Sequence, residues 1–250
     1  MSGAGEPIAD RVAAAPARTV AAGTARLFSA WGNGSAVPGA RDRRCEGVAD
    51  LAARRARVSQ VLVPERMAAG FLAGTDDDGA LREFSAPREM IYDGANAYIR
   101  VADRWTGFDL GDPGGPRGIN DPLWPLDALF GARDDAVEAG HEAVRGVATT
   151  RYGLTVDLAR ADAEVPAGVS VPAGPHRGLS RMPAEVWLDA AGLTRRVAVS
   201  AEPVTAAADV QIWIIVELWD FGVAVDITPP RPDEVAAPRE ADWDTPGPAA

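Results

Sequence analysis

Lysine is absent from this sequence, and all 25 of its basic residues are arginines. That absence bears on the stretch DFG at 220–222, because kinase chemistry needs a lysine on the phosphates, a glycine-rich loop and an HRD catalytic loop besides a DFG. The chain has neither GxGxxG nor HRD, so a kinase is excluded. We expect instead that Asp220 accepts hydrogen bonds where a strand ends, that Phe221 packs, and that Gly222 permits a bend into a short edge segment.

Cysteine and histidine are scarce. Cys45 is the only cysteine, and His141 and His176 are the only histidines. A lone cysteine cannot form an internal disulfide, and no CxxC or Cys/His cluster exists for zinc. Neither histidine has a serine or cysteine neighbour in a G-x-S-x-G arrangement. We therefore expect no catalytic residue, no metal, no cofactor and no enzymatic activity, and keep a hydrolase with an unrecognised site as the alternative.

Long apolar runs and a basic surplus are also missing. The longest apolar stretch, VQIWIIVELW at 210–219, is far too short to cross a membrane as a helix. The N-terminus has no basic region followed by an apolar core, so it is not a secretory signal, and Cys45 follows RDRR rather than a lipobox. As written, the sequence predicts a cytoplasmic protein, with the cell envelope as the alternative if a leader is missing. The net charge of −11 argues against a nucleic-acid partner.

The sequence is rich in the alternating patterns that form β-strands. It has 250 residues, of which 47% are apolar, enough for one large domain with a core. Stretches in which apolar and polar residues alternate predict that most of the chain is β-strand. These stretches lie at 24–31, within 46–63, at 88–92 and 96–101 around an Asp-Gly turn, and at 104–110, 146–158, 182–202 and 210–219.

Helices are few by comparison. Residues 7–22 are rich in alanine and predict a helix. The stretch DPLWPLDALFGA at 121–132 predicts a short helix with Asp121 as its N-cap, and residues 159–164 predict a helical turn.

The late strands each have one apolar face. In the last of them Ile214 and Val216 point one way and Glu217 the other. Such strands are typical of an antiparallel sheet that is covered on one side only. The predicted fold class is α+β, a curved antiparallel β half-barrel wrapped over a few helices. It forms one domain over residues 1–228, and the Pro-rich, acidic stretch 229–250 is expected to be a disordered tail.

Two small helices do not fill the concave side of a long curved sheet, so we expect an apolar cavity there, and such cavities take up apolar guests. The alternative is an ordinary core, closed by protein. The expected ligand-binding residues come from the late strands, with the helix at 121–132 as a lid. They are Tyr152, Leu154, Val186, Leu188, Val197, Ile212, Ile214 and Val216 on the strands, and Trp124, Leu126, Leu129 and Phe130 in the lid.

Three motifs follow one another in the C-terminal half. Together they resemble the LppX/LprG lipoproteins and their relatives with the LolA-like fold, over residues 120–230. In that group a strand with G-x-x-T-x-x-Y-x-x-x-x-D precedes L-P-x-x-V-W-x-D-x-x-G-x-x-R-R, and the chain ends as D-F-G-x-x-V-x-I-x-x-P. The matching residues are Gly146, Thr149, Tyr152 and Asp157; Pro183, Val186, Trp187, Asp189, Gly192, Arg195 and Arg196; and Asp220, Phe221, Gly222, Val225, Ile227 and Pro229.

The resemblance implies an antiparallel half-barrel over helices with an apolar cavity between them. Relatives bind lipids, lipidated proteins or glycolipids and carry them through the envelope. The leading hypothesis is a non-catalytic carrier of a lipid or another apolar small molecule. The alternative is a protein-interaction or regulatory module of the same fold with a filled core, which would bind a protein partner through exposed Trp187, Trp213 and Trp219.

Overall fold

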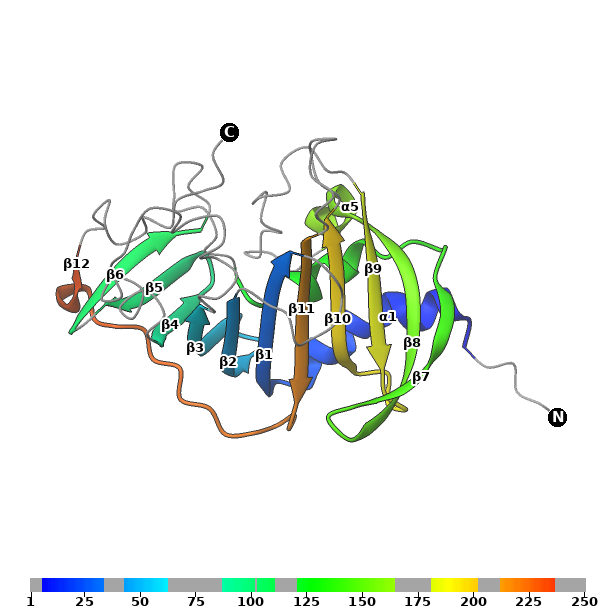
Figure 1. The fold of residues 1–250 in the computed structure, drawn as a ribbon, viewed down its shortest axis with the longest axis horizontal. Coiled ribbons are helices and arrows are strands. Elements are labelled where there is room, and N and C mark those ends of the chain that lie inside the picture. Colours follow the sequence, from blue (N-terminus) through cyan, green and yellow to red (C-terminus); the bar gives the residue numbers. More distant parts are fainter. Residues whose placement is uncertain are drawn as a thin grey trace, which may run out of the picture.

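The computed structural model describes residues 6–33, 43–62, 87–101, 103–110, 121–164, 181–201 and 212–236. Within these ranges twelve strands form one sheet, in the order β12-β6-β5-β4-β3-β2-β1-β11-β10-β9-β8-β7. Neighbouring strands are antiparallel except for β12, which runs parallel to β6. The predicted α+β half-barrel class is confirmed, because this open sheet curves over a few helices (Figure 1).

The N-terminal half supplies one helix and six strands, close to the predicted positions. The expected hairpin around the Asp-Gly turn is present, with Gly94 at φ 60°, the left-handed conformation that such a turn requires. The elements are α1 (Ile8–Ala21), β1 (Thr24–Asn33), β2 (Arg43–Asp50), β3 (Arg55–Leu62), β4 (Arg88–Asp93), β5 (Asn96–Val101) and β6 (Arg104–Asp109).

The C-terminal half begins with the short helix expected at 121–132. It is a single α-turn followed by a 3-10 turn, and a Cβ at Gly131 would lie 2.0 Å from the Asp157 carbonyl oxygen, so only glycine permits this close approach. The elements are α4 (Trp124–Ala128), η1 (Leu129–Gly131), β7 (Val137–Val144), β8 (Val147–Asp157), α5 (Leu158–Glu164), β9 (Arg181–Leu188), β10 (Thr194–Ala201), β11 (Ile212–Trp219), η2 (Pro232–Glu234) and β12 (Val235–Ala236).

The principal contacts of the described helices involve one part of the sheet. In the described part of the chain, the principal helix–sheet contacts join α1 to β10, α4 to β10 and β11, and α5 to β8. We call β8–β11 the helix-covered half. Strands β2–β6, which take no part in those principal contacts, are the wing, and they lie at the left in Figure 1.

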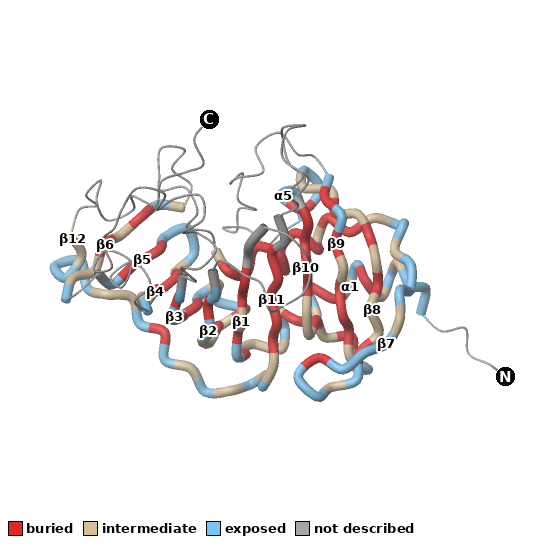
Figure 2. Tube along the Cα trace, in the orientation of Figure 1, coloured by how far each residue is buried: buried red, intermediate tan, exposed pale blue. Residues whose placement is uncertain are grey.

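One buried apolar cluster extends over the concave face of both parts. It joins residues of the helix-covered half and its helices to residues of the wing, such as Val58, Met90 and Ile99. Burial is most continuous along the central strands β1, β11, β10 and β9 (Figure 2). The alternation predicted for the late strands is therefore confirmed on the concave side.

The convex side carries a second, smaller cluster, which the sequence did not predict. Val144 ends β7 and packs with Trp187, Ala198 and Ile215 of β9, β10 and β11. The hairpin of β7 and β8 thus crosses the outer face of the helix-covered half. Trp187 was expected on a wet face, and its burial beneath this hairpin corrects that expectation.

Two further differences concern the ends of the sheet. Strand β7 is an edge strand whose residues are mostly exposed, so it lacks the apolar alternation that marks the other strands. At the other edge, residues 229–236 of the expected tail return to the sheet, where Val235 pairs with Trp105 and Ala236 with Thr106. Residues 237–250 of that tail lie outside the described residues.

The DFG stretch forms the expected bend at the end of β11. Asp220 and Gly222 have φ of 49° and 81°, and the Gly222 N–H donates to the Thr24 carbonyl oxygen at 2.8 Å. The Asp220 carbonyl oxygen accepts a hydrogen bond from the Val223 N–H at 3.2 Å, and Phe221 packs against the core cluster. The expected edge segment is wrong, because residues 223–230 form no strand.

Candidate ligand-binding face

The structure brings the predicted strand residues together on the concave face. Tyr152, Val186, Val197 and Val216 stand directly opposite one another across β8, β9, β10 and β11 and form one transverse row. Leu154 and Ile214 belong to the next row, through Ala184 and Val199. All of these side chains and Leu188 are buried in the same cluster. Ile212 is in β11, but its side chain lies outside the described residues. The role of these residues as ligand contacts stays a prediction.

The predicted lid packs onto this row. Trp124, Leu126 and Leu129 are buried in the same cluster, and α4 contacts β10 and β11. Phe130 is partly exposed, since consecutive residues of a helical turn point in different directions. The helices therefore act as a plug for the helix-covered half.

The wing presents two further apolar rows on the same face, which sequence reasoning missed as a site. The strand pairings place Gly47, Val58, Met90, Ile99 and Thr106 in one row. The second row consists of Ala49, Ala56, Tyr92, Ala97 and Phe108. The sequence signal was present, because each of these strands alternates, but only the late strands had been assigned to the site.

A buried polar cluster ties α4 to the turn between β2 and β3. Arg54, in that turn, donates through Nη2 to Asp121 Oδ2 at 2.8 Å and also to Asp127 of α4. Asp121 Oδ1 accepts from the Leu123 N–H at 2.8 Å, so the predicted N-cap holds the turn before the helix. Arg54 Nη1 is buried and has no hydrogen-bond partner among the described residues. The cluster fixes the wing to the lid.

The electrostatics of this cluster follow from one guanidinium being shared by two carboxylates. Burial raises the pKa of Asp127 to about 8, Arg54 opposes that shift, and the negative charge of Asp121 adds to it. Asp127 is only 1% exposed, so bulk water does not stabilise its charge. At neutral pH the raised pKa favours the protonated form of Asp127.

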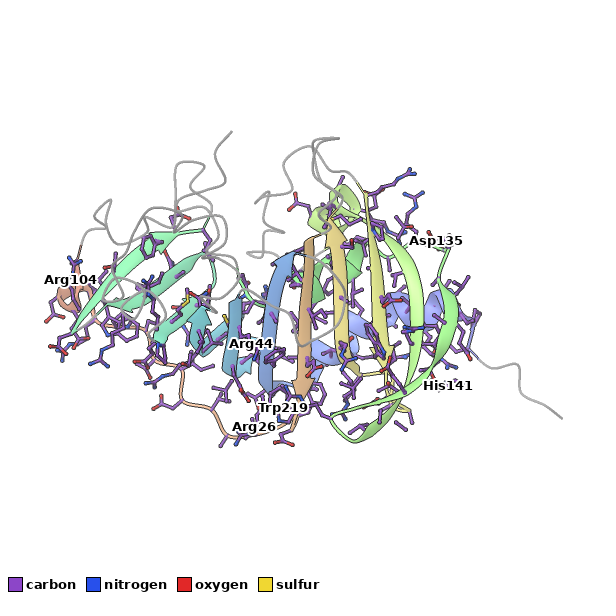
Figure 3. All side chains as sticks on the ribbon, in the orientation of Figure 1. Arg26, Arg44, Arg104, Asp135, His141 and Trp219 are labelled. Atoms are coloured by element: carbon purple, nitrogen blue, oxygen red, sulfur yellow. The ribbon has the colours of Figure 1, made fainter. Side chains whose placement is uncertain are left out.

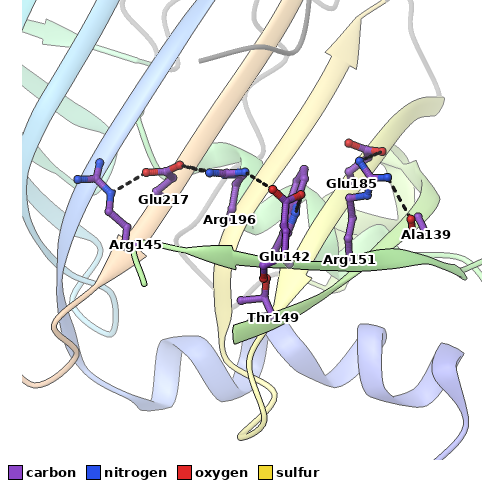
Figure 4. A network of polar contacts seen from close by, with 9 residues as sticks. Ala139, Glu142, Arg145, Thr149, Arg151, Glu185, Arg196 and Glu217 are labelled. Carbon is purple, nitrogen blue, oxygen red and sulfur yellow. Dashed lines mark hydrogen bonds and ion pairs between the residues drawn. The ribbon is translucent and has the colours of Figure 1, made fainter. Parts of the chain in front are cut away.

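The convex face is closed by a chain of charged groups (Figure 4). Arg145, in the turn between β7 and β8, donates to Glu217 at 2.7 Å, and Glu217 also accepts from Arg196 at 2.7 Å. Glu142 of β7 lies 3.8 Å from Arg196 and accepts from the Trp187 indole N–H at 2.6 Å. The contacts of Arg145 and Glu142 fasten the hairpin to the strands beneath it, and the Arg196–Glu217 pair joins β10 to β11.

This arrangement removes most of the aromatic surface that a protein-interaction module was expected to use. Trp187 is 4% exposed and hydrogen-bonded. Trp219, which is labelled in Figure 3, lies beneath the Arg145 guanidinium at 4.0 Å from its ring centroid. The side chain of Trp213 lies outside the described residues. Within the described part of the chain, no specific observation favours the interaction module.

Of the cysteine and histidines weighed for catalysis, the two that the structure describes, Cys45 and His141, lie on different strands, β2 and β7. His141 is exposed on β7 and lies 3.3 Å from Glu138 (Figure 3). Cys45 is buried, and its sulfur accepts from Gln60 at 3.7 Å. His176 lies outside the described residues. No group of three or more metal-ligating side chains occurs in the described ranges.

None of the described helices has the length and apolar character that a membrane span requires.

Comparison with known proteins supports the fold alone. No protein-family model and no curated protein matches the sequence. Among solved structures, the chain is similar to LprF from Mycobacterium bovis, with 14% identity and a TM-score of 0.53 over 91% of this chain and 99% of that one. It is also similar to the Mycobacterium tuberculosis lipoprotein LppX, with 11% identity and a TM-score of 0.51 over 87% of this chain and 98% of that one. The chain therefore has the half-barrel fold of LprF and LppX, which is the fold that its motifs implied.

Proposed function

We propose that this protein is a non-catalytic carrier that holds a lipid or another apolar molecule against the concave face of its half-barrel. The observation that carries the proposal is the continuous apolar cluster on the concave face, which joins the helix-covered half and its helices to the wing. We place the ligand on this face, beside the lid formed by α4.

The driving force would be burial of apolar area. Each methylene transferred from water contributes about 0.8 kcal/mol, so ten methylenes contribute roughly 8 kcal/mol before the costs of ordering and association are subtracted. Met90, Ile99 and Phe108 offer the kind of apolar surface that such a chain needs. The lining predicted in the helix-covered half would then support the lid and form one end of the site.

The fold similarity to LprF and LppX supports this function through the motif resemblance, which implies relatives that bind lipids. It also favours an envelope location in our proposal over the cytoplasmic one expected from the sequence, for which the comparisons offer no support.

Organic extraction of the purified protein, followed by mass spectrometry, tests the proposal. We expect a lipid to be recovered in up to equimolar amount, and we expect the extracted protein to bind a neutral apolar compound such as oleyl alcohol. A protein that yields no lipid and does not bind oleyl alcohol would not be a carrier.

A further inference from the structure

The stretch that follows β11 runs from the centre of the sheet to its outer edge. It ends in β12, which pairs with β6. In the sheet order, β1 and all five strands of the wing lie between β11 and β12. Figure 1 shows this stretch as an orange trace that passes below the wing. We call residues 223–236 the strap. It gives β6 a second connection to β11, beside the ladder of intervening strands.

The inner end of the strap is fastened to the first residue of β1. The Thr24 hydroxyl donates to the Val223 carbonyl oxygen at 2.6 Å, and the Gly222 N–H donates to the Thr24 carbonyl oxygen at 2.8 Å. Phe221, just before the strap, packs against the core cluster, and the Arg195 guanidinium lies 4.8 Å from its ring centroid. This end is therefore fixed at the centre of the sheet.

The middle of the strap lies against the protein, although it forms no strand. Exposure alternates along it, since Ala224 and Asp226 are exposed, Val225 between them is half-buried, and Ile227 is only 9% exposed. This period of two is that of an extended chain with one covered side. The three prolines of the strap fix φ and lack an N–H, so they favour the extended form.

The outer end docks on β6 at the end of an apolar row. Val235 and Ala236 pair in parallel with Trp105 and Thr106, and Thr106 ends the row that contains the other wing strands' concave residues. A Cβ at Gly107 would lie 2.9 Å from Val235 Cγ1, so glycine leaves the space that the Val235 side chain occupies. The outer end of the strap therefore has a fitted position on β6.

A closed turn leads the strap to this position. The Arg231 N–H and guanidinium donate to the two carboxylate oxygens of Glu234 at 2.9 Å each, and the Glu234 N–H donates to the Arg231 carbonyl oxygen at 2.9 Å. Strand β12 itself has two residues, both half-buried, whereas β6 pairs with β5 over six. Release of β12 thus costs less than separation of β6 from β5, because fewer backbone pairs are lost.

We propose that the strap holds the outer edge of the wing in place and that its release from β6 loosens the ligand-binding face. This inference rests on the proposed carrier function and names a conformational control of the same face. Thr106 continues the row of Ile99, Met90 and Val58, so a shift of β6 moves the end of that row. Segments of low local stability are the ones that move when a binding site opens.

Three aspartate substitutions in the full chain test this inference, because they add the same charge at different depths. Val235→Asp and Ile227→Asp each place a carboxylate where an apolar side chain packs, which should release the strap. We expect about tenfold faster hydrogen exchange in β5 and β6, unchanged exchange in β9 and β10, and severalfold weaker binding of oleyl alcohol by calorimetry after lipid extraction. Ala224→Asp, on the exposed side of the strap, is the matched control and should change none of these.

A second variant approaches the same contact from β6. Gly107→Ala crowds the Val235 side chain without adding charge, and it should change exchange and binding in the same direction as Val235→Asp. Unchanged exchange in β9 and β10 shows that each variant is folded.

The outcomes separate the strap from the carrier function. If Val235→Asp, Ile227→Asp and Gly107→Ala exchange in β5 and β6 as Ala224→Asp does, the strap does not hold the wing, and the inference is wrong while the carrier remains. If exchange rises but oleyl alcohol binds as it does to wild type, the strap does not control the ligand, which also overturns the inference. If wild type binds no oleyl alcohol and yields no lipid, the carrier function fails and the inference fails with it.

Discussion

At the scale of single residues, Asp127 is notable in the described structure for its strongly raised pKa. Its carboxyl group is buried in the lid helix and shares Arg54 with Asp121. A buried ion pair contributes little net stability, but the removal of one partner is costly because it leaves the other charge uncompensated. The cluster therefore serves to fix α4 at one position on the wing.

The raised pKa of Asp127 predicts a particular dependence of stability on pH. The pKa is about 8 in the folded chain and 3.8 ordinarily, so between these values the folded state holds a proton that the unfolded state has lost. The free energy of unfolding should then fall as pH rises from about 5 to 8, with a slope approaching 1.4 kcal/mol per unit. The side chain that Asp127→Asn introduces is neutral at every pH. Urea unfolding of this variant should therefore give a free energy of unfolding that varies less with pH, and at pH 9 this free energy should exceed that of wild type.

The pH range in which Asp127 affects stability is separate from the range in which acidic groups with a lowered pKa do so. The pKa of Asp157 is lowered chiefly by the backbone N–H of Arg160, so its contribution to stability is lost only as pH falls below the ordinary carboxyl range. An Asp127→Asn profile as steep as that of wild type between pH 5 and 8 would contradict the assignment to Asp127.

The identity of single residues did not reveal the cluster of Arg54, Asp121 and Asp127. Asp121 was predicted to cap the helix, and it does hold the turn before it. Its pairing with Arg54 joins positions far apart in the sequence, so no local pattern indicates it. The same holds for Trp187, whose alternation with apolar neighbours predicts a wet face, because the hairpin that covers it comes from another part of the chain.

At the scale of elements, the hairpin of β7 and β8 stabilises the convex face of the helix-covered half. Its first strand was missed because it is polar on both sides, which is typical of an edge strand. Apart from β12, which lies in the expected tail, the other described strands were predicted, since each buries one alternating face. Alternation therefore identified the strands that form the core and not the one that lies over it.

Arg145→Ala tests how the hairpin is held. The substitution leaves Glu217, which is 6% exposed, with only Arg196 as its partner and uncovers Trp219. We expect a loss of about 1–3 kcal/mol in the free energy of unfolding and faster hydrogen exchange in residues 137–150. Arg26→Ala is the matched control, since the Arg26–Asp220 pair is exposed on the same face and should contribute less than about 1 kcal/mol. Equal effects of the two substitutions would show that Arg145 does not hold the hairpin.

At the scale of the whole molecule, the account depends on the continuity of the apolar concave face across both parts of the sheet. The sequence predicted the curved sheet, the apolar face and the few helices. It assigned the ligand to the helix-covered half because the motifs and the clearest alternation lie there. Pairing registers, which a single sequence does not contain, were needed to show that the wing continues the same apolar rows.

A space-filling substitution tests most directly whether the wing has room for a ligand. Ala97 lies between Tyr92 and Phe108 on the concave side, and Ala198 lies in the packed convex cluster, and both are buried alanines on strands. We measure the thermal midpoint and oleyl alcohol binding of Ala97→Phe and Ala198→Phe. If the wing holds a ligand, Ala97→Phe retains the wild-type midpoint and loses binding, whereas Ala198→Phe loses about 1–3 kcal/mol of stability by overpacking. If Ala97→Phe is destabilised as much as Ala198→Phe, and still binds as wild type does, the wing is a filled core and the ligand does not lie on it.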